Sequence, residues 1–359
     1  MRLFECQACS YTLSFEETLC GDCGRELGYE PAMGRLLTIE SAGDGVFSVF
    51  GTQSGAQPSY RRCANASHGA CNWLIAADSN EMLCLCCRTN TTIPDISNEV
   101  FAGRWREIEL AKHRLFYSLI RLGLATPNKQ DDPAGGLSFQ FLADLADLRV
   151  MTGHEDGLIT INIAEADSVE RERARNDMHE PYRTLLGHFR HEIGHYYWDR
   201  LVRDASRFDD FRAVFGDEQD DYQAALQRYY AGNFPQDWRD RFVTQYASSH
   251  PWEDFAETFA HYLHMIDTLE TAYAFGLRIR PRARLQSTAD TTIDFDPYRA
   301  MDFTQIVESW GPLTYAVNSL NRSMGQPDLY PFTLVPGVIE KLGFIDRLMK
   351  EPMAALRAA

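Results

Sequence analysis

The sequence predicts an α+β fold, with a small cysteine-rich β module at the N-terminus and a larger, mainly helical domain that includes a small sheet. All nine cysteines lie within the first 87 of 359 residues, so we expect them to organise only the N-terminal region of the chain. Short apolar runs between glycines in that region are typical of strands. Later segments repeat apolar residues every three or four positions, which indicates helices. With 45% hydrophobic residues, the chain can bury a large core beside a small module.

Two cysteine pairs, written CQAC and CGDC, open the chain. In each pair two residues separate the cysteines, so both thiolates can face one point, and four thiolates close a tetrahedral zinc shell without water. So short a segment has too little core to fold by itself, and the metal would supply most of its folding free energy. We therefore predict a first structural zinc site with the ligands Cys6, Cys9, Cys20 and Cys23.

A less regular group of five cysteines follows, and it predicts a second structural zinc site. One pair has the same close spacing as before, and two cysteines further upstream can complete the shell. The remaining thiol, Cys86, is a spare or a substitute ligand, and His68 is another substitute. The predicted ligands are Cys63, Cys71, Cys84 and Cys87.

The strand-like segments among these cysteines are Gly34–Glu40 and Gly45–Gly51, which suit a small β module built around its metals. Zinc ribbons often bind nucleic acid, but residues 1–95 carry eleven acidic residues against six arginines and no lysine. The whole chain has a formal net charge of -16. Because binding to phosphates needs clustered basic side chains, we expect no nucleic-acid partner.

No apolar run follows the opening MRLFECQACS, and no apolar stretch is long enough to cross a bilayer. We therefore expect a cytoplasmic protein without a membrane partner. Disulfides fit poorly with that reducing compartment, and closely paired cysteines there point to metal instead.

A helix is predicted over residues 98–124, because apolar residues recur there at helical spacing and Gly123 can end it. Its charged flank, with Lys112 and His113, is expected to lie in solvent. The following PNKQDDPAGG combines proline, glycine and charge, which marks a loop. The chain then divides into a zinc-ribbon region at 1–95, a connecting helix and junction loop at 96–130, and a large domain at 131–359.

A strand is predicted at Gly157–Asp167, where isoleucines alternate with smaller and polar residues. Two interpretations stay open. The strand could form the edge of a sheet beside a metal cleft, where an extended substrate would pair with it, or it could be an ordinary core strand.

The segment Thr184–Val202 contains the motif HEIGH on a predicted helix with a buried apolar stripe. His191 and His195 lie one turn apart on it, so both imidazoles can bind one zinc ion, with Glu192 angled toward water at the open position of the metal. Gly194 costs about 1 kcal/mol inside a helix, which makes sense if another backbone approaches closely there. The alternative is a pair of ordinary, hydrogen-bonded histidines.

A third metal ligand decides between these interpretations. The extended motif with a nearby glycine and histidine fails, because Trp198 and Leu201 occupy those positions. A later predicted helix, in SSHPWEDFAETFAHYLHM, carries Glu253 and Glu257 one turn apart. We predict that Glu253 binds zinc and that Glu257 accepts a hydrogen bond from a ligand histidine. A fourth nitrogen would fill the position that hydrolysis needs, so His188 is expected to lie around the site or in the core.

Seven segments resemble the bacterial zinc-binding metallopeptidases that carry an N-terminal zinc ribbon. They are YRRCANASHGACNW, CRTNTTIPD, AKHRLFYSLIRLGL, TGHEDGLITINIAEAD, EPYRTLLGHFRHEIGHYYWDRL, WEDFAETFAHYLH and LNRSMGQPDLYPF. The resemblance covers nearly the whole chain. It implies a zincin-like domain of the gluzincin type, with zinc on His191, His195 and Glu253 and with Glu192 as the general base.

The oxyanion of such a reaction needs a further stabiliser. Resemblance to lethal-factor-like sites makes Tyr246 the first candidate, with His250 and Tyr330 behind it. The alternative for a lone tyrosine is a packing role with a satisfied hydroxyl.

The resemblance implies a peptide or protein substrate and zinc as the cofactor, with one catalytic ion and one or two structural ions. Two other functions stay open. One is a non-catalytic adaptor whose zinc ribbons bind protein partners, and the other is a protease that its ribbons recruit to nucleic acid. The acidity of the front end argues against the second function, and an intact Glu192 argues against the first.

Overall fold

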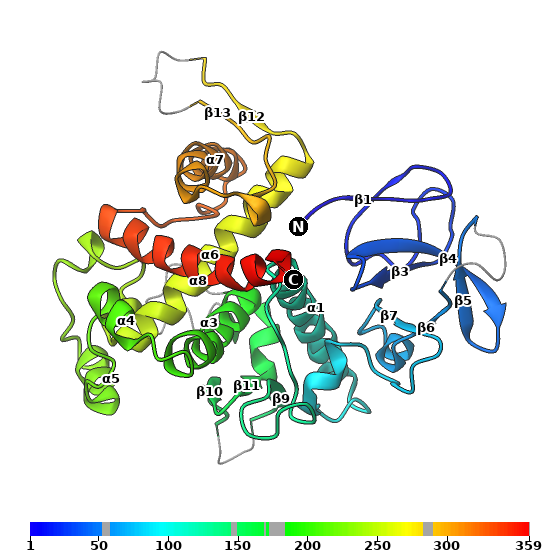
Figure 1. The fold of residues 1–359 in the computed structure, drawn as a ribbon, viewed down its shortest axis with the longest axis horizontal. Coiled ribbons are helices and arrows are strands. Elements are labelled where there is room, and N and C mark those ends of the chain that lie inside the picture. Colours follow the sequence, from blue (N-terminus) through cyan, green and yellow to red (C-terminus); the bar gives the residue numbers. More distant parts are fainter. Residues whose placement is uncertain (52–57, 145–148, 169, 172–183, 283–289, 359) are drawn as a thin grey trace. The chain divides into compact units, whose positions relative to one another are not determined.

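A computed structural model gives the fold, in which the chain forms two compact units (Figure 1). The first unit contains Met1–Arg121 and Ala125–Arg171, and the second contains Leu122–Leu124 and Glu172–Ala359. The domain boundaries expected near residues 95 and 130 remain predictions. The structure describes the whole chain except residues 52–57, 145–148, 169, 172–183, 283–289 and 359.

Short antiparallel strands form the front of the first unit. β1 (Phe4–Glu5) pairs with β2 (Thr12–Leu13), and a five-stranded sheet follows in the order β3-β4-β5-β6-β7. Buried apolar side chains from β4, β6 and β7 form a core cluster of this sheet. The two strands predicted from the sequence are confirmed as β4 and β5. The strands of the sheet are β3 (Leu27–Glu30), β4 (Arg35–Gly43), β5 (Val46–Val49), β6 (Tyr60–Arg62) and β7 (Leu74–Ala76).

The predicted helix is confirmed as α1 (Glu99–Arg121), which is followed by Gly123 with a φ of 68°. Its apolar stripe is buried, as expected. The expectation that Lys112 and His113 lie in solvent is wrong, because they are 0% and 3% exposed. This flank, which also carries the buried Glu109, contacts the second group of cysteines and β8 instead of water.

A four-stranded sheet in the order β10-β11-β9-β8 completes the first unit. The strand predicted at Gly157–Asp167 is confirmed as β11, and a short helical turn takes over after it. Its interpretation as a sheet edge is wrong, because β11 pairs with β9 on one side and with β10 on the other. The strands are β8 (Asn90–Thr92), β9 (Ser138–Leu142), β10 (Gly153–Glu155) and β11 (Leu158–Asn162).

The second unit is mainly helical, which confirms the α+β class. α3 and α6 pack against each other, and α6 also contacts α7 and α8. Between α6 and α7 lies a hairpin of β12 (Arg278–Ile279) and β13 (Thr291–Thr292). Within the described ranges, no helix has the length and apolar content to cross a membrane. The helices are α3 (Leu185–Trp198), α4 (Phe208–Phe215), α5 (Tyr222–Tyr230), α6 (Pro251–Ala274), α7 (Phe303–Ser323) and α8 (Pro336–Ala358).

Short helical turns connect these elements, and one of them continues α3 as a π-helix. The turns are η1 (Ala64–His68), η2 (Cys87–Thr89), η3 (Ile163–Ala166), η4 (Asp199–Arg203, the π-helix), η5 (Trp238–Asp240), η6 (Tyr246–Ser248) and η8 (Pro297–Arg299).

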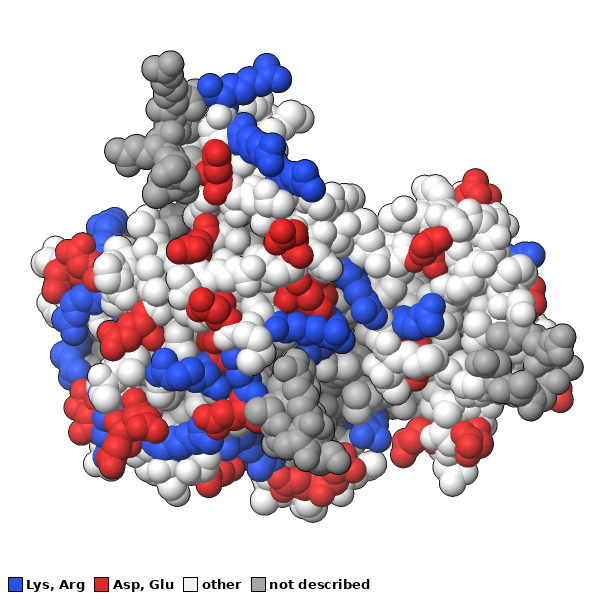
Figure 2. Space-filling view, turned by 45° about the horizontal axis from the view of Figure 1, so that its top comes forward, with Lys and Arg blue, Asp and Glu red and all other residues white. Residues whose placement is uncertain are grey.

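The surface of the protein carries side chains of both charges. Figure 2 shows acidic and basic side chains mingled over the face in view, so the negative net charge is not gathered into one patch there.

α3 and α6 approach each other closely at Gly194. A β-carbon added to this glycine would lie 2.9 Å from Ala256 Cα and 3.2 Å from Ala256 O. Both are backbone atoms, so no side chain can turn aside to make room. The close backbone expected from the glycine in HEIGH is therefore α6.

We expect Gly194→Ala to lower the free energy of unfolding by about 1–3 kcal/mol, because the added methyl group must push the two helices apart. Gly103→Ala is the matched control in α1, where nothing lies within 4 Å of an added β-carbon. That variant should gain about 1 kcal/mol from helix propensity. Chemical denaturation of the zinc-loaded chains measures both effects, and an unchanged Gly194→Ala variant would contradict the close approach.

Candidate metal centres

The two helices that carry the predicted metal ligands begin at side-chain caps. Thr184 Oγ1 accepts a hydrogen bond from Gly187 N (2.9 Å) at the start of α3. His250 Nδ1 accepts one from Trp252 N (3.1 Å) at the start of α6, where Pro251 occupies the first turn. Each cap fixes where its helix begins and therefore which side chains share a face.

Three predicted ligand atoms meet where α3 packs on α6. Glu253 Oε2 lies 3.0 Å from His191 Nε2 and 3.4 Å from His195 Nε2, and the two nitrogens are 3.1 Å apart. Although Glu253 Oε2 is buried, it has no hydrogen-bond partner among the described residues. A buried carboxylate oxygen in that state is costly, and a cation would satisfy it. Because two imidazoles and a carboxylate are a common donor set for catalytic zinc, the residues present fit that metal.

Hydrogen bonds hold His191 from its other ring nitrogen. Nδ1 lies 2.8 Å from Glu257 Oε1, and Thr244 Oγ1 donates to Glu257 Oε2 at 2.7 Å. Burial disfavours the ionised form of Glu257, but the hydrogen bonds from His191 and Thr244 favour it, and the pKa of Glu257 lies below the usual value. An N–H on Nδ1 leaves the lone pair of Nε2 facing Glu253, which is the orientation a metal ligand requires.

Sequence reasoning misses Tyr222, the first residue of α5. Its hydroxyl donates to Glu253 Oε1 at 2.6 Å, so it holds the other oxygen of this carboxylate. The cap at Asp221 signals the start of a helix, but no local pattern marks the tyrosine. Its role depends on a partner that lies on another helix.

Glu192 follows the predicted ligand His191 in the sequence. Its side chain is buried, and the residue is 8% exposed. Burial raises its pKa, while the charges of His191 and His195 act in the opposite direction. A carboxylate with a raised pKa is a stronger base than one in water. Neither Glu192 nor His188 contributes to the three converging atoms.

The three candidates for oxyanion stabilisation have different surroundings. The ring of Tyr246 lies 6.0 Å from that of His191, and burial raises the pKa of its hydroxyl well above the usual value. The hydroxyl of Tyr330 is 2.7 Å from His261 Nδ1, and His250 caps α6. Both alternatives to Tyr246 therefore have their polar groups engaged elsewhere.

The first four cysteines come together from two turns of the same design. Cys6 Sγ lies 3.7 Å from Cys23 Sγ, and Cys9 Sγ lies 3.6 Å from Cys20 Sγ. In each turn, the residue after the second cysteine has a positive φ and donates its N–H to the carbonyl of the first cysteine at 2.9 Å. The two turns present four thiols to one point, as a structural zinc site requires.

The second group of four cysteines is buried entirely. Cys71 Sγ and Cys84 Sγ are 3.7 Å apart, and the backbone N–H of Cys84 donates to Cys63 Sγ at 3.4 Å. Of the two substitute ligands, Cys86 lies outside the four-sulfur group and His68 is exposed. The four sulfurs belong to Cys63, Cys71, Cys84 and Cys87.

Known proteins resemble this chain over nearly its whole length. A family profile described as "Putative zinc-binding metallo-peptidase" matches residues 102–348, and one described as a zinc-ribbon domain matches residues 3–98. Uncharacterized proteins of Mycobacterium tuberculosis and Mycobacterium bovis are each 41% identical over 352 residues, which is 98% of this chain and 96% of each relative. No solved structure matches the chain. The chain therefore belongs to the zinc-binding metallopeptidase family and carries its own N-terminal zinc-ribbon domain.

Proposed function

We propose that this protein is a zinc-dependent peptidase in which His191, His195 and Glu253 hold the catalytic ion and Glu192 is the general base. The convergence of three donor atoms on a buried point carries the proposal, since Glu253 Oε2 has no hydrogen-bond partner among the described residues. Family membership supports both zinc and a peptide or protein substrate. Zinc held there would polarise a water molecule and the scissile carbonyl group.

The side chains around that point would supply the proton transfers. Glu192 would take a proton from the attacking water and pass it to the leaving amine, and its burial favours this role because it raises the pKa of the carboxyl. Tyr246, whose ring lies beside that of His191, is the proposed donor to the oxyanion.

The two cysteine groups would hold structural zinc and fold the front of the chain around it. As part of this proposal, the zinc ribbons offer a surface for a protein partner, and the acidic balance of residues 1–95 argues against nucleic acid. The ligands would be Cys6, Cys9, Cys20 and Cys23 at the first site and Cys63, Cys71, Cys84 and Cys87 at the second.

A cleavage assay tests the peptidase proposal directly. The zinc-loaded full chain is incubated with a mixed peptide library, and the products are identified by mass spectrometry. We expect cleavage that a chelator stops and added zinc restores. An adaptor would bind protein partners without cleaving any peptide, and that outcome in zinc-replete buffer would replace the proposed function.

We expect Tyr222→Phe to weaken zinc binding at the catalytic site by about 10- to 100-fold, because outer hydrogen bonds orient metal ligands. The lost hydroxyl would free Glu253 Oε1 to rotate away from its present position. Competition with a fluorescent chelator measures the affinity, and Tyr230→Phe, an exposed tyrosine on the same helix, is the control. Equal affinities in both variants would show that Tyr222 does not position Glu253.

A further inference from the structure

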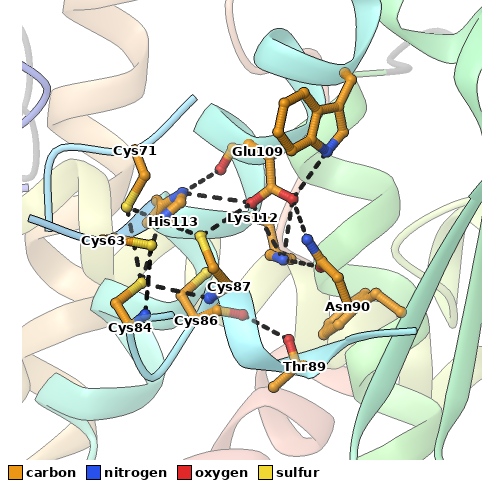
Figure 3. A network of polar contacts seen from close by, with 12 residues as sticks. Cys63, Cys71, Cys84, Cys86, Cys87, Thr89, Asn90, Glu109, Lys112 and His113 are labelled. Atoms are coloured by element: carbon orange, nitrogen blue, oxygen red, sulfur yellow. Dashed lines mark hydrogen bonds and ion pairs between the residues drawn. The ribbon is translucent and has the colours of Figure 1, made fainter. Parts of the chain in front are cut away.

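His113 faces the second group of cysteines from α1 (Figure 3). Its Nε2 lies 3.2 Å from Cys71 Sγ, 3.7 Å from Cys87 Sγ and 4.0 Å from Cys84 Sγ. Neighbouring sulfurs within the two cysteine groups lie 3.6 to 3.7 Å apart. The imidazole nitrogen therefore stands at about the spacing that separates two ligands of one ion.

The other ring nitrogen is engaged in the manner of a metal-bound histidine. Nδ1 lies 2.6 Å from the backbone oxygen of Glu109, and a carbonyl oxygen can only accept, so Nδ1 carries the N–H. The Nε2 atom faces the sulfurs, so its lone pair, when the nitrogen is unprotonated, points to where the thiolates would hold an ion. His191 has the equivalent arrangement at the proposed catalytic site, with Glu257 as its partner.

A buried polar network keeps the imidazole in this position. The carboxylate of Glu109 accepts hydrogen bonds from Trp105 Nε1 (3.2 Å) and Lys112 Nζ (3.3 Å), and Asn90 on β8 contacts both Glu109 and Lys112 (Figure 3). These contacts tie α1 to β8 beside the cysteines. The ring of His113 is itself buried, so it cannot turn out into water.

A separate ion between Cys86, Glu109 and His113 would use the same ring, and their ligand atoms also lie within 4.8 Å of one another. Lys112 Nζ already stands 3.2 Å from Glu109 Oε2, so a positive charge occupies that side of the carboxylate. A metal there would place two cations on one buried anion. The contacts thus favour one site that includes His113 over two adjacent sites.

We propose that the second zinc site has five donor atoms for four positions, so that His113 can replace Cys63 as the fourth ligand beside Cys71, Cys84 and Cys87. Four thiolates, or three thiolates and one imidazole, both occur in structural zinc sites. The first site has no such reserve among the described residues, because its group contains four cysteines and no histidine.

Zinc content of the full-length chain tests this proposal. Cys63→Ser should hold as many zinc ions as the parent, because His113 completes the shell. His113→Ala should also keep them all, because four thiolates remain, whereas the double variant should hold one ion fewer. Cobalt loading gives a second readout, since the visible bands of Cys63→Ser should move to shorter wavelength as nitrogen replaces sulfur.

Two further variants keep the result unambiguous. Cys20→Ser at the first site is the matched control and should lose one ion. Cys63→Ala repeats the test without a hydroxyl beside the metal. The proposal is overturned if Cys63→Ser and Cys63→Ala both hold one ion fewer than the parent, whether or not they fold. It is equally overturned if the double variant holds as much zinc as Cys63→Ser.

Discussion

Glu192→Gln should keep its zinc and lose roughly 100- to 10,000-fold in kcat/KM for peptide hydrolysis. The amide keeps the size of the side chain but cannot accept a proton from the attacking water. Zinc content should not change, because Glu192 is not one of the three converging donors. Metal analysis and a hydrolysis assay on the same preparation measure both properties.

Glu253→Gln is the counterpart that separates chemistry from metal binding. It removes a charged ligand, so zinc affinity itself should fall by more than the roughly 10- to 100-fold typical of residues that only orient a ligand. The zinc affinity of Glu257→Gln should lie between those of Glu192→Gln and Glu253→Gln, since Glu257 contacts His191 and not the converging point. If Glu253→Gln bound zinc normally while Glu257→Gln did not, the third ligand would have been misassigned.

Lys341→Met should lower the free energy of unfolding by about 3–5 kcal/mol, because it leaves a buried carboxylate without its partner. Lys341 on α8 contacts Asp254 Oδ2 at 2.6 Å, and the side chain of Asp254 is 0% exposed. The ion pair joins α8 to the first turn of α6, next to Glu253. Chemical denaturation of the zinc-loaded chain measures the loss.

The cost of Lys341→Met should also rise with pH. Burial raises the pKa of Asp254 to about 7, even though Lys341 favours the charged form. A raised pKa means that the folded state holds the proton more tightly than the unfolded state, so stability falls as pH rises through that value. Without Lys341 the pKa rises further, and the loss should be larger at about pH 8 than at about pH 5.

A surface pair provides the control for this substitution. Arg322 contacts Asp328 at 2.6 Å, but its side chain is 63% exposed. Arg322→Met should therefore cost no more than about 1 kcal/mol. Equal losses in Arg322→Met and Lys341→Met would show that burial does not set the strength of the Asp254 pair.

Local patterns predicted the features whose causes are themselves local. Two residues between paired cysteines are enough to bring two thiols to one point, and helical spacing is enough to set His191 and His195 one turn apart. The same reasoning found α1 and the strands β4 and β5. Even the close approach at Gly194 had a local signal, because a glycine inside a helix is costly without a reason.

Features that depend on residues distant in the sequence cannot be predicted from local patterns. Helical periodicity assigns Lys112 and His113 to solvent, but cysteines and a strand from earlier in the chain cover that flank. Tyr222 gains its role only because Glu253 reaches it from another helix. β11 is an inner strand because β10 pairs with its outer side, and β10 is a three-residue strand with no apolar pattern of its own.

The two cysteine groups differ in how far oxidants and chelators can reach them. Cys23 in the first group is exposed and Cys9 is partly exposed, whereas every member of the second group is buried. Attack on thiolates follows their accessibility. Under oxidative stress the first proposed zinc site would therefore lose its ion before the second. The N-terminal turns would then unfold while α1 kept its contacts with the second group of cysteines. Zinc loss from this front end would then serve as an early sign of chemical damage to the protein.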